Sequence, residues 1–369
     1  MLESLQYRSS NGREIVYADV ITPPEGMVPQ GIVQIIHGMC EHIGRYHEFM
    51  QYLAEHGFVV CGHDQIGHGR SAAVNGTGYF APKDGWDCLV RDARQLTILI
   101  RGRFPSLPVY LLGHSMGSFV AREYITRYKD LDGVLLSGTG GSNPAAGAMS
   151  AMIRTMIPLK GEKYRSDWIN EKVFGGFNQA FPEEPSPFAW LSRDAAEVAK
   201  YEADPMCGFV FTLSGYADLM KLISRVSGEK WARRVPVELP VYLFSGSCDP
   251  VGGMGKGVRE VTGLLQHSGL QHLKMKLYPE GRHEMLNELC RQEVYADILE
   301  WLGRRKKFDA DGIKQPVGST IILKGFHGIG KGPVLLPNCN SPMAISTKIR
   351  SQKWKMKEKF RNDTGLWVY

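Results

Sequence analysis

Residues 108–117, Pro-Val-Tyr-Leu-Leu-Gly-His-Ser-Met-Gly, decide how the rest of the chain is interpreted. The first five are apolar and partly β-branched, which is typical of a short buried strand. A G-x-S-x-G turn follows, and residues 118–125 can continue as a helix. In such a strand–turn–helix arrangement the two glycines avoid Cβ clashes, and the serine hydroxyl is exposed above the sheet. We therefore predict that Ser115 is a nucleophile. The alternative is a small-residue turn whose serine only caps the helix.

Short apolar runs and helical patterns alternate on both sides of this turn. Such alternation predicts βαβ units and an α/β fold with a doubly wound, mostly parallel sheet. We expect the first strand to lie at an edge of that sheet. The predicted strands are 14–21, 31–36, 58–61, 108–112, 133–138, 240–246 and 273–278. The predicted helices of the core are 46–56, 86–103 and 287–302.

The alternation stops between residues 141 and 234, where helical stretches, prolines and large apolar side chains prevail. We interpret 141–234 as an inserted helical cap, or lid, on a core made of 1–140 and 235–303. The remaining residues, 304–369, are a basic C-terminal extension that we expect to be poorly ordered. They carry 14 Lys and Arg against 4 Asp and Glu, whereas the whole chain is formally +6. The core is therefore slightly acidic, and the basicity of the tail says nothing about its substrate.

The cysteines and the N-terminus bear on the cellular compartment. Seven cysteines are scattered along the chain, which favours a reducing compartment over a disulfide framework. Residues 1–4, Met-Leu-Glu-Ser, lack the basic and apolar regions of a signal peptide. No run reaches the roughly 18 apolar residues of a membrane span. We expect a cytoplasmic protein, with peripheral membrane contact left open.

A serine hydroxyl needs a base to take its proton and an acid to orient that base. In hydrolase sheets that carry the serine turn, an acid and then a histidine follow later in the chain, each in a loop after a late strand. Asp249 comes directly after predicted strand 240–246, and His283 comes after predicted strand 273–278. We therefore predict Ser115, Asp249 and His283 as a catalytic triad.

Other residues near these loops offer alternatives. Glu280 and Glu284 flank His283 and are rival orienting acids, although a neighbour in the same loop seldom reaches the far ring nitrogen. Asp249 stands before a proline, which is also compatible with simple turn chemistry. The rival bases His267 and His272 precede the last strand, which places them at the wrong edge of the sheet.

Attack on a carbonyl also develops an oxyanion, which needs fixed hydrogen-bond donors. One donor is expected to be the backbone N–H of Met116, directly after the nucleophile. The second usually comes from a loop that follows an early strand at a His-Gly pair. Here that loop begins with His37 and Gly38, so the N–H of Met39 is the candidate.

Three stretches together resemble the monoacylglycerol lipase and lysophospholipase branch of the α/β-hydrolase fold. They are HGMCEHIGRY at 37–46, DQIGHGRS at 64–71 and GHSMG at 113–117. The resemblance covers roughly residues 10–303. It implies the Ser115–Asp249–His283 triad and hydrolysis of a carboxylic ester of a small, single-chain lipid. Ser118 stands where the family commonly has a glycine, and the cap contains no recognisable motif, so the substrate remains open.

Other activities are compatible with the same triad. Relatives of this fold include aminopeptidases, thioesterases and acyltransferases, and an aminopeptidase would need an acidic group for the substrate amine. Glu41, Glu183 and Glu184 are available for that role, but nothing in the sequence places them. A non-catalytic binding protein is a further alternative, against which the intact nucleophile, acid and base argue.

We expect no metal and no cofactor. The histidines at 37, 42, 47, 63 and 68 are metal-ligand types, but loop roles already explain two of them. Residues 325–332 nearly match a phosphate-binding loop but lack its final hydroxyl. The basic stretch 348–361 is expected to be solvated, with transient membrane-surface contact by tail or cap as the alternative. We expect a small acyl ester as substrate and no nucleic acid.

Overall fold

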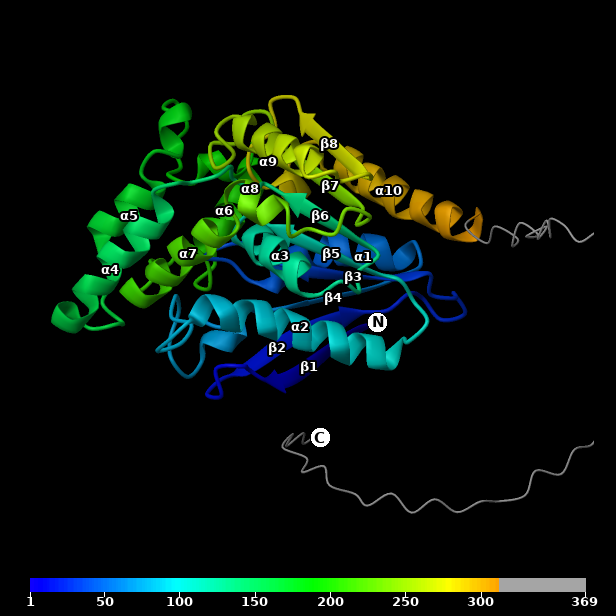
Figure 1. Cartoon of the computed structure of the whole chain (residues 1–369), viewed down its shortest axis with the longest axis horizontal. Helices are drawn as coiled ribbons and strands as arrows, with labels where there is room; N and C mark the ends of the chain where they lie inside the picture. The colour runs from blue at the N-terminus through cyan, green and yellow to red at the C-terminus, as the bar shows by residue number, and fades with distance from the viewer. Residues whose placement is uncertain (312–369) are drawn as a thin grey trace, which may run out of the picture. The chain divides into compact units, whose positions relative to one another are not determined.

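Eight strands form a single sheet in residues 1–311, the part of the chain that the computed structural model describes (Figure 1). They are β1 (Leu2–Arg8), β2 (Ile15–Ile21), β3 (Gly31–Ile36), β4 (Phe58–His63), β5 (Val109–His114), β6 (Gly133–Ser137), β7 (Val241–Gly246) and β8 (Leu273–Tyr278). Seven of these, all except β1, begin and end within two residues of the predicted runs because each run is short and rich in apolar residues.

The strand order is β1-β2-β4-β3-β5-β6-β7-β8. Neighbouring strands in this order are parallel from β4 through β3 to β8. The pairs β1–β2 and β2–β4 are antiparallel. The predicted α/β class and mostly parallel sheet are therefore confirmed. Because β4 and β5 lie on opposite sides of β3, the strand order reverses there. In open α/β sheets, ligands bind outside the carboxyl ends of strands at such a reversal.

The prediction that the first strand lies at an edge is wrong in detail. β2 is an inner strand, paired with β1 on one side and β4 on the other. The sequence LESLQYR of β1 escaped notice because its side chains are mostly exposed, so it shows little apolar patterning. An edge strand buries few side chains, and its backbone pairing rather than its composition places it in the sheet.

Helices cover both faces of the sheet (Figure 1). Adjacent strand residues such as Val134 and Leu135 belong to opposite apolar clusters, as the period of two in a strand requires. One cluster contains side chains of α2, α3 and α9, and the other contains side chains of α1 and α10. These helices are α1 (His47–Glu55), α2 (Gly85–Arg103), α3 (Met116–Arg127), α9 (Lys256–His267) and α10 (Arg291–Asp311).

A helical segment is inserted between β6 and β7. It contains α4 (Ala146–Lys160), α5 (Asp167–Phe174), α6 (Ala195–Ala203), α7 (Leu213–Arg225) and α8 (Gly228–Ala232). We call residues 138–240 the inserted segment. Short 3₁₀ turns occur in it and in the core: Ile43–Tyr46, Gly69–Ala72, Asn178–Ala180, Ala189–Leu191 and Met285–Asn287.

The last helix differs from its prediction. It was expected over 287–302, but α10 begins at Arg291 and continues to Asp311. The basic residues after 303 mark the end of the apolar pattern rather than the end of the helix. Most of the predicted C-terminal extension, from residue 312 on, lies outside the described residues. No helix in the described range is long and apolar enough to cross a membrane.

Candidate active site

Ser115 lies at the turn between β5 and α3, at the carboxyl edge of the sheet. Its backbone has φ 51° and ψ −117°, a strained conformation that costs a non-glycine residue about 1–3 kcal/mol. The surroundings hold this turn. The Ser115 N–H donates to the Ser137 carbonyl at 2.9 Å, and the Ser118 hydroxyl donates to the Ser115 carbonyl at 2.6 Å. A Cβ at Gly117 would overlap the Ile36 carbonyl, so this position tolerates only glycine.

Asp249 and His283 come together from two different loops, after β7 and after β8. His283 Nδ1 donates to Asp249 Oδ1 at 3.0 Å, and both side chains are buried. The same Oδ1 also accepts the N–H of Val251 at 2.9 Å, and Oδ2 accepts the Ser245 hydroxyl at 2.7 Å. Three donors thus fix the carboxylate, and the carboxylate fixes the ring of His283.

The surroundings lower the pKa of Asp249 and raise the pKa of His283. Burial alone would raise the pKa of Asp249, but the charge of His283 and the three hydrogen bonds outweigh burial and lower it. Burial alone would lower the pKa of His283, but the charge and hydrogen bond of Asp249 raise it instead. A base with a raised pKa beside a fixed carboxylate is suited to proton transfer near neutral pH.

The loop after β3 approaches the turn that carries Ser115. A Cβ built on Gly38 would lie 3.2 Å from the Cβ of Ser115 and 2.6 Å from Glu41 Oε1, so the lack of a side chain favours this close approach. Met39 follows directly, and Cys40 has a φ of 57°, which turns the chain sharply. Met116 is the first residue of α3, where backbone N–H groups have no intrahelical acceptor. Among the described residues, the N–H groups of Met39 and Met116 donate no hydrogen bond.

Glu41 holds this loop in place, a role that sequence reasoning missed. Its Oε1 accepts the Gly38 N–H at 2.5 Å and the Tyr46 hydroxyl at 2.8 Å. Arg45 donates to Glu41 Oε2 at 2.9 Å and binds Glu284 at 2.5 and 2.7 Å. Burial would raise the pKa of Glu284, but Arg45 lowers it to about 2. Both carboxylates are therefore already paired with Arg45.

Ser115 and His283 line the same cavity, which has a volume of about 740 Å³. Its floor also includes Met39 and Met116, whereas most of its walls come from the inserted segment. The walls are mainly apolar, and their large side chains are Phe119, Met149, Phe177, Phe188, Trp190, Leu191, Phe209, Leu219, Met220 and Ile223. A cavity of this size and character accommodates a small apolar ligand.

The rival residues have other partners. Glu280 has a side chain that is 81% exposed, and it pairs with Arg193. His267 ends α9 and His272 precedes β8, so both lie at the amino edge of the sheet. Glu184 pairs with Arg282 rather than lining the cavity. Neither Glu280 nor Glu284 accepts a hydrogen bond from the His283 ring among the described contacts.

The histidines considered as metal ligands do not act as one set. His37, His42 and His47 each have a different hydrogen-bond partner. Within residues 1–311, one grouping has three ligand atoms within 4.8 Å of one another, and it consists of His42, Asp204 and Cys207. His42 Nδ1 already accepts a backbone N–H, so Nε2 carries the proton that it shares with Asp204 at 2.8 Å. This arrangement is that of an ordinary hydrogen-bonded pair.

The cysteines in the described range are all free thiols, and the seventh, Cys339, lies outside it. Cys40 and Cys207 lie near the cavity, and burial raises the pKa of both thiols. A thiol with a raised pKa is a poor nucleophile. Neither thiol therefore competes with Ser115 as the candidate nucleophile of this cavity.

Several known lipases and esterases are similar to this chain. A monoacylglycerol lipase from Mycolicibacterium smegmatis is 30% identical over 295 residues, which are 79% of this chain and 93% of that protein. A monoglyceride lipase from Rattus norvegicus is 28% identical over 291 residues, covering 76% of this chain and 85% of that protein. A thermostable carboxyl esterase from Bacillus coagulans superposes with a TM-score of 0.78 at 31% identity, over 82% of this chain and 98% of that one.

A family model described as serine aminopeptidase, S33, matches residues 28–290. The match spans β3 to β8 and the loops that carry Ser115, Asp249 and His283. The resemblance inferred from the three sequence motifs is thereby confirmed. This chain belongs to the serine aminopeptidase S33 family of α/β-hydrolases.

Proposed function

We propose that this chain is a serine hydrolase that cleaves carboxylic esters of small lipids of the monoacylglycerol type. One observation carries the proposal. The strained turn at Ser115, the buried His283–Asp249 pair and the backbone N–H groups of Met39 and Met116, which donate no hydrogen bond among the described residues, lie at one apolar cavity. The lipase and esterase names of the relatives with 30% and 31% identity support an ester as substrate.

In the proposed reaction, Asp249 holds Nδ1 of His283 and leaves Nε2 to take the proton of Ser115. The Ser115 oxygen attacks the acyl carbonyl, and the N–H groups of Met39 and Met116 stabilise the oxyanion. His283 then protonates the leaving alcohol, which yields an acyl-enzyme on Ser115. Water then attacks the acyl-enzyme. His283 takes a proton from this water and returns it to the Ser115 oxygen as the carboxylic acid leaves. A single oxyanion donor typically contributes about 10²–10³-fold in rate.

The charges at the cavity favour an ester over an aminoacyl amide. Recognition of a substrate amine needs an unpaired carboxylate, but Glu41 and Glu284 are both bound to Arg45. The third lining carboxylate, Glu171, is exposed on α5. The side chain of Arg45 is only 9% exposed and binds both carboxylates, so either acid would have to lose this partner to receive an amine. The large apolar walls supplied by the inserted segment suit an acyl chain.

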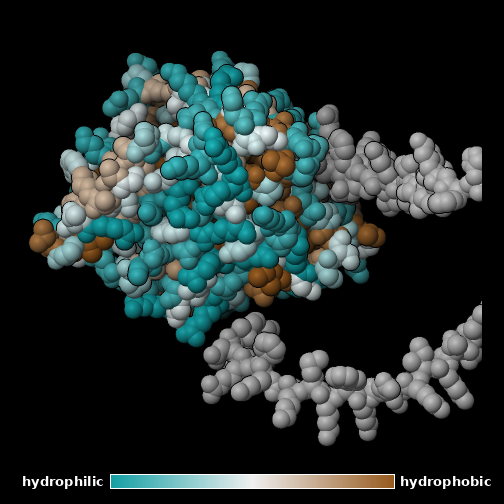
Figure 2. Space-filling view, viewed as in Figure 1, coloured by the Kyte–Doolittle hydropathy of each residue, from teal (hydrophilic) through white to brown (hydrophobic). Residues whose placement is uncertain are grey.

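We also propose that the inserted segment acts as a cap that meets lipid surfaces transiently. On its helices α4 and α5, three large apolar side chains are exposed: Met152, Leu159 and Trp168. Figure 2 shows apolar atoms where α4 lies, at one end of the described residues, and further apolar spots elsewhere on a surface that is mostly hydrophilic. Exposed large apolar side chains that gather on one segment are a usual feature of lipid-contacting surfaces.

The test is a substrate panel on the purified full chain. It compares short-, medium- and long-chain monoacylglycerols, lysophospholipids, acyl thioesters and aminoacyl amides, each with a Ser115→Ala control. The proposal expects the highest kcat/KM with monoacylglycerols and loss of that activity in the control. A preference for the amides would overturn the choice of substrate class, and equal activity of the control would overturn the role of Ser115.

A further inference from the structure

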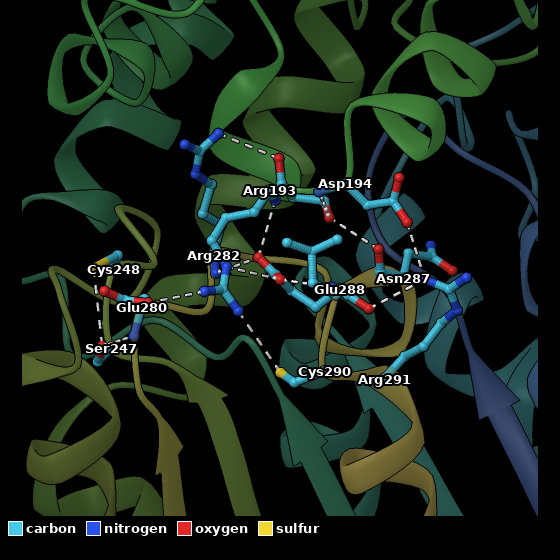
Figure 3. A network of polar contacts seen from close by, with 12 residues as sticks. Arg193, Asp194, Ser247, Cys248, Glu280, Arg282, Asn287, Glu288, Cys290 and Arg291 are labelled. Carbon is cyan, nitrogen blue, oxygen red and sulfur yellow. Dashed lines mark hydrogen bonds and ion pairs between the residues drawn. The ribbon is translucent and has the colours of Figure 1, made fainter.

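A buried carboxylate outside the triad joins the loop of His283 to the inserted segment. Glu288 is completely buried, and its two oxygens accept four N–H groups. Oε1 accepts the backbone N–H of Arg282 and that of Arg193, both at 3.0 Å. Oε2 accepts Arg193 Nε at 3.0 Å and the Leu289 N–H at 2.8 Å. Figure 3 shows Arg193 reaching from the inserted segment to this carboxylate.

The position of these donors gives Glu288 its significance. Arg282 is the residue immediately before His283, so Glu288 fixes the peptide that leads into the catalytic base. Arg193 belongs to the inserted segment, 95 residues away in the chain. A single oxygen therefore connects the two backbones. A buried carboxylate whose oxygens accept four N–H groups is firmly held, because hydrogen bonds to a carboxylate are stronger than those between neutral groups.

Further contacts continue this connection up to His283 itself. The His283 N–H donates to the Trp190 carbonyl at 3.3 Å, and the Glu284 N–H donates to the Leu191 carbonyl at 2.7 Å. The rings of Trp190 and His283 lie 5.2 Å apart. The guanidinium of Arg282 donates to the carbonyl of Ala189 at 2.7 Å. The backbone of His283 is thus held by the inserted segment as well as by its own loop.

We propose that Glu288 is a positioning residue for His283, which keeps the base in register with Asp249 by locking residue 282 to the inserted segment at Arg193. It touches no reacting atom and acts only through these backbones. The inference rests on the proposed function for the identity of the base. It also implies that this side of the inserted segment stays attached during turnover, so that any opening of the cavity takes place elsewhere along it.

Glu280 supplies a matched control in the same loop. It binds the same Arg193, at 3.2 Å, but its side chain is 81% exposed. An exposed ion pair contributes little to stability because water screens it. The Glu280→Gln variant therefore removes a charge from the same network without removing a backbone contact.

The experiment compares wild type with Glu288→Ala, Glu288→Gln, Arg193→Ala and Glu280→Gln, each checked by thermal melting. The readout is the rate at which a fluorophosphonate labels Ser115, measured as a function of pH. Labelling needs the serine and its base but no particular ester. The labelling rate falls at low pH as the base becomes protonated, and the position of this fall, the acid limb, reports the pKa of His283 in the free enzyme. The charged and titratable groups that face His283 are Asp249, Glu284, Glu41 and His114, and none of them is changed in these variants.

For folded Glu288→Ala we expect labelling to slow by about tenfold or more and the acid limb to move to lower pH, because His283 loses part of its contact with Asp249. Glu288→Gln keeps an oxygen for the two backbone N–H groups, so it should recover part of the rate. Arg193→Ala should slow labelling less than Glu288→Ala, and Glu280→Gln should match wild type.

The inference is overturned if folded Glu288→Ala labels at the wild-type rate, or if its rate falls only with the folded fraction while the acid limb stays in place. If that variant does not fold, Glu288→Gln and Arg193→Ala decide in the same way. A wild type that labels at Ser115 in a Glu288-dependent manner but hydrolyses no ester would overturn the proposed substrate and leave the positioning role standing.

Discussion

Replacement of Asp249 by asparagine and by alanine should give two very different losses of activity. Asp249 Oδ1 accepts both His283 Nδ1 and the Val251 N–H, whereas Oδ2 accepts only the hydroxyl of Ser245. An asparagine is therefore expected to place its carbonyl oxygen at the Oδ1 site, where two donors converge. Its NH₂ group would take the Oδ2 site and donate to Ser245, whose hydroxyl can also accept. The ring of His283 would keep its orientation and tautomer.

The magnitude follows from what each variant removes. Asp249→Asn loses only the negative charge that stabilises the protonated ring, worth about 1.5–3 kcal/mol for a hydrogen bond to a charged group. At 1.36 kcal/mol per factor of ten, kcat/KM should fall by about 10- to 100-fold. Asp249→Ala also loses the orientation of His283, and removing the acid of a triad costs about 10⁴-fold. The acid limb of kcat/KM should move to lower pH in Asp249→Asn, because the charge that raises the pKa of His283 is gone.

The assay is steady-state hydrolysis of a monoacylglycerol by both variants across a range of pH, with melting curves to confirm folding. An Asp249→Asn enzyme as inactive as Asp249→Ala would refute the reasoning, since it would mean that the amide is turned the other way or that charge is decisive. Near wild-type activity in both variants would remove Asp249 from the mechanism altogether.

Four further outcomes are expected. Burial lowers the pKa of His63 to about 3 from 6.5, so the folded state keeps it neutral while the unfolded chain binds a proton below about pH 6.5. Its contribution to stability is present above that pH and is lost as pH falls towards 3. Urea unfolding should therefore show about 2 kcal/mol of this loss between pH 6.5 and 5, and none of it in a folded His63→Phe variant. Gly117→Ala should abolish folding or activity because the added Cβ overlaps a strand carbonyl, whereas Gly263→Ala, on open helix surface, should stabilise by about 0.5–1 kcal/mol in thermal melting. Leu159→Glu should reduce the amount of protein that sediments with phospholipid vesicles. Val28→Glu, at a similarly exposed apolar position outside the inserted segment, should not; an equal effect of both would remove α4 from the proposed membrane contact.

Much of the fold could be predicted because its signals are local. The strand Gly31–Ile36 was predicted with its observed bounds, since a buried parallel strand must be apolar throughout. Helices α1 and α2 were predicted to within a residue or two for a similar reason: each has one apolar face and a glycine or proline near its end. The inserted segment was recognised only by the loss of strand–helix alternation, and its individual helices were not delimited.

The parts that could not be predicted depend on contacts between distant residues. Nothing in the composition of Leu2–Arg8 marks it as a strand, because its backbone pairing with β2 alone makes it one. The link between Arg193 and Glu288 spans 95 residues and follows no periodicity. Glu41 was considered as a free acid for an amine, but its pairing with Arg45 becomes visible only in three dimensions. The Asp249 and His283 positions were accessible from sequence because each directly follows a recognisable strand.

The central claim of this account is that Ser115 is the nucleophile and His283 its base. Peptide mapping by mass spectrometry after reaction with a fluorophosphonate tests it most directly. We expect a single stoichiometric adduct on Ser115, no adduct in Ser115→Ala, and strongly slowed labelling in His283→Ala. An adduct on another residue, or a Ser115→Ala enzyme that still hydrolyses monoacylglycerol at the wild-type rate, would contradict it.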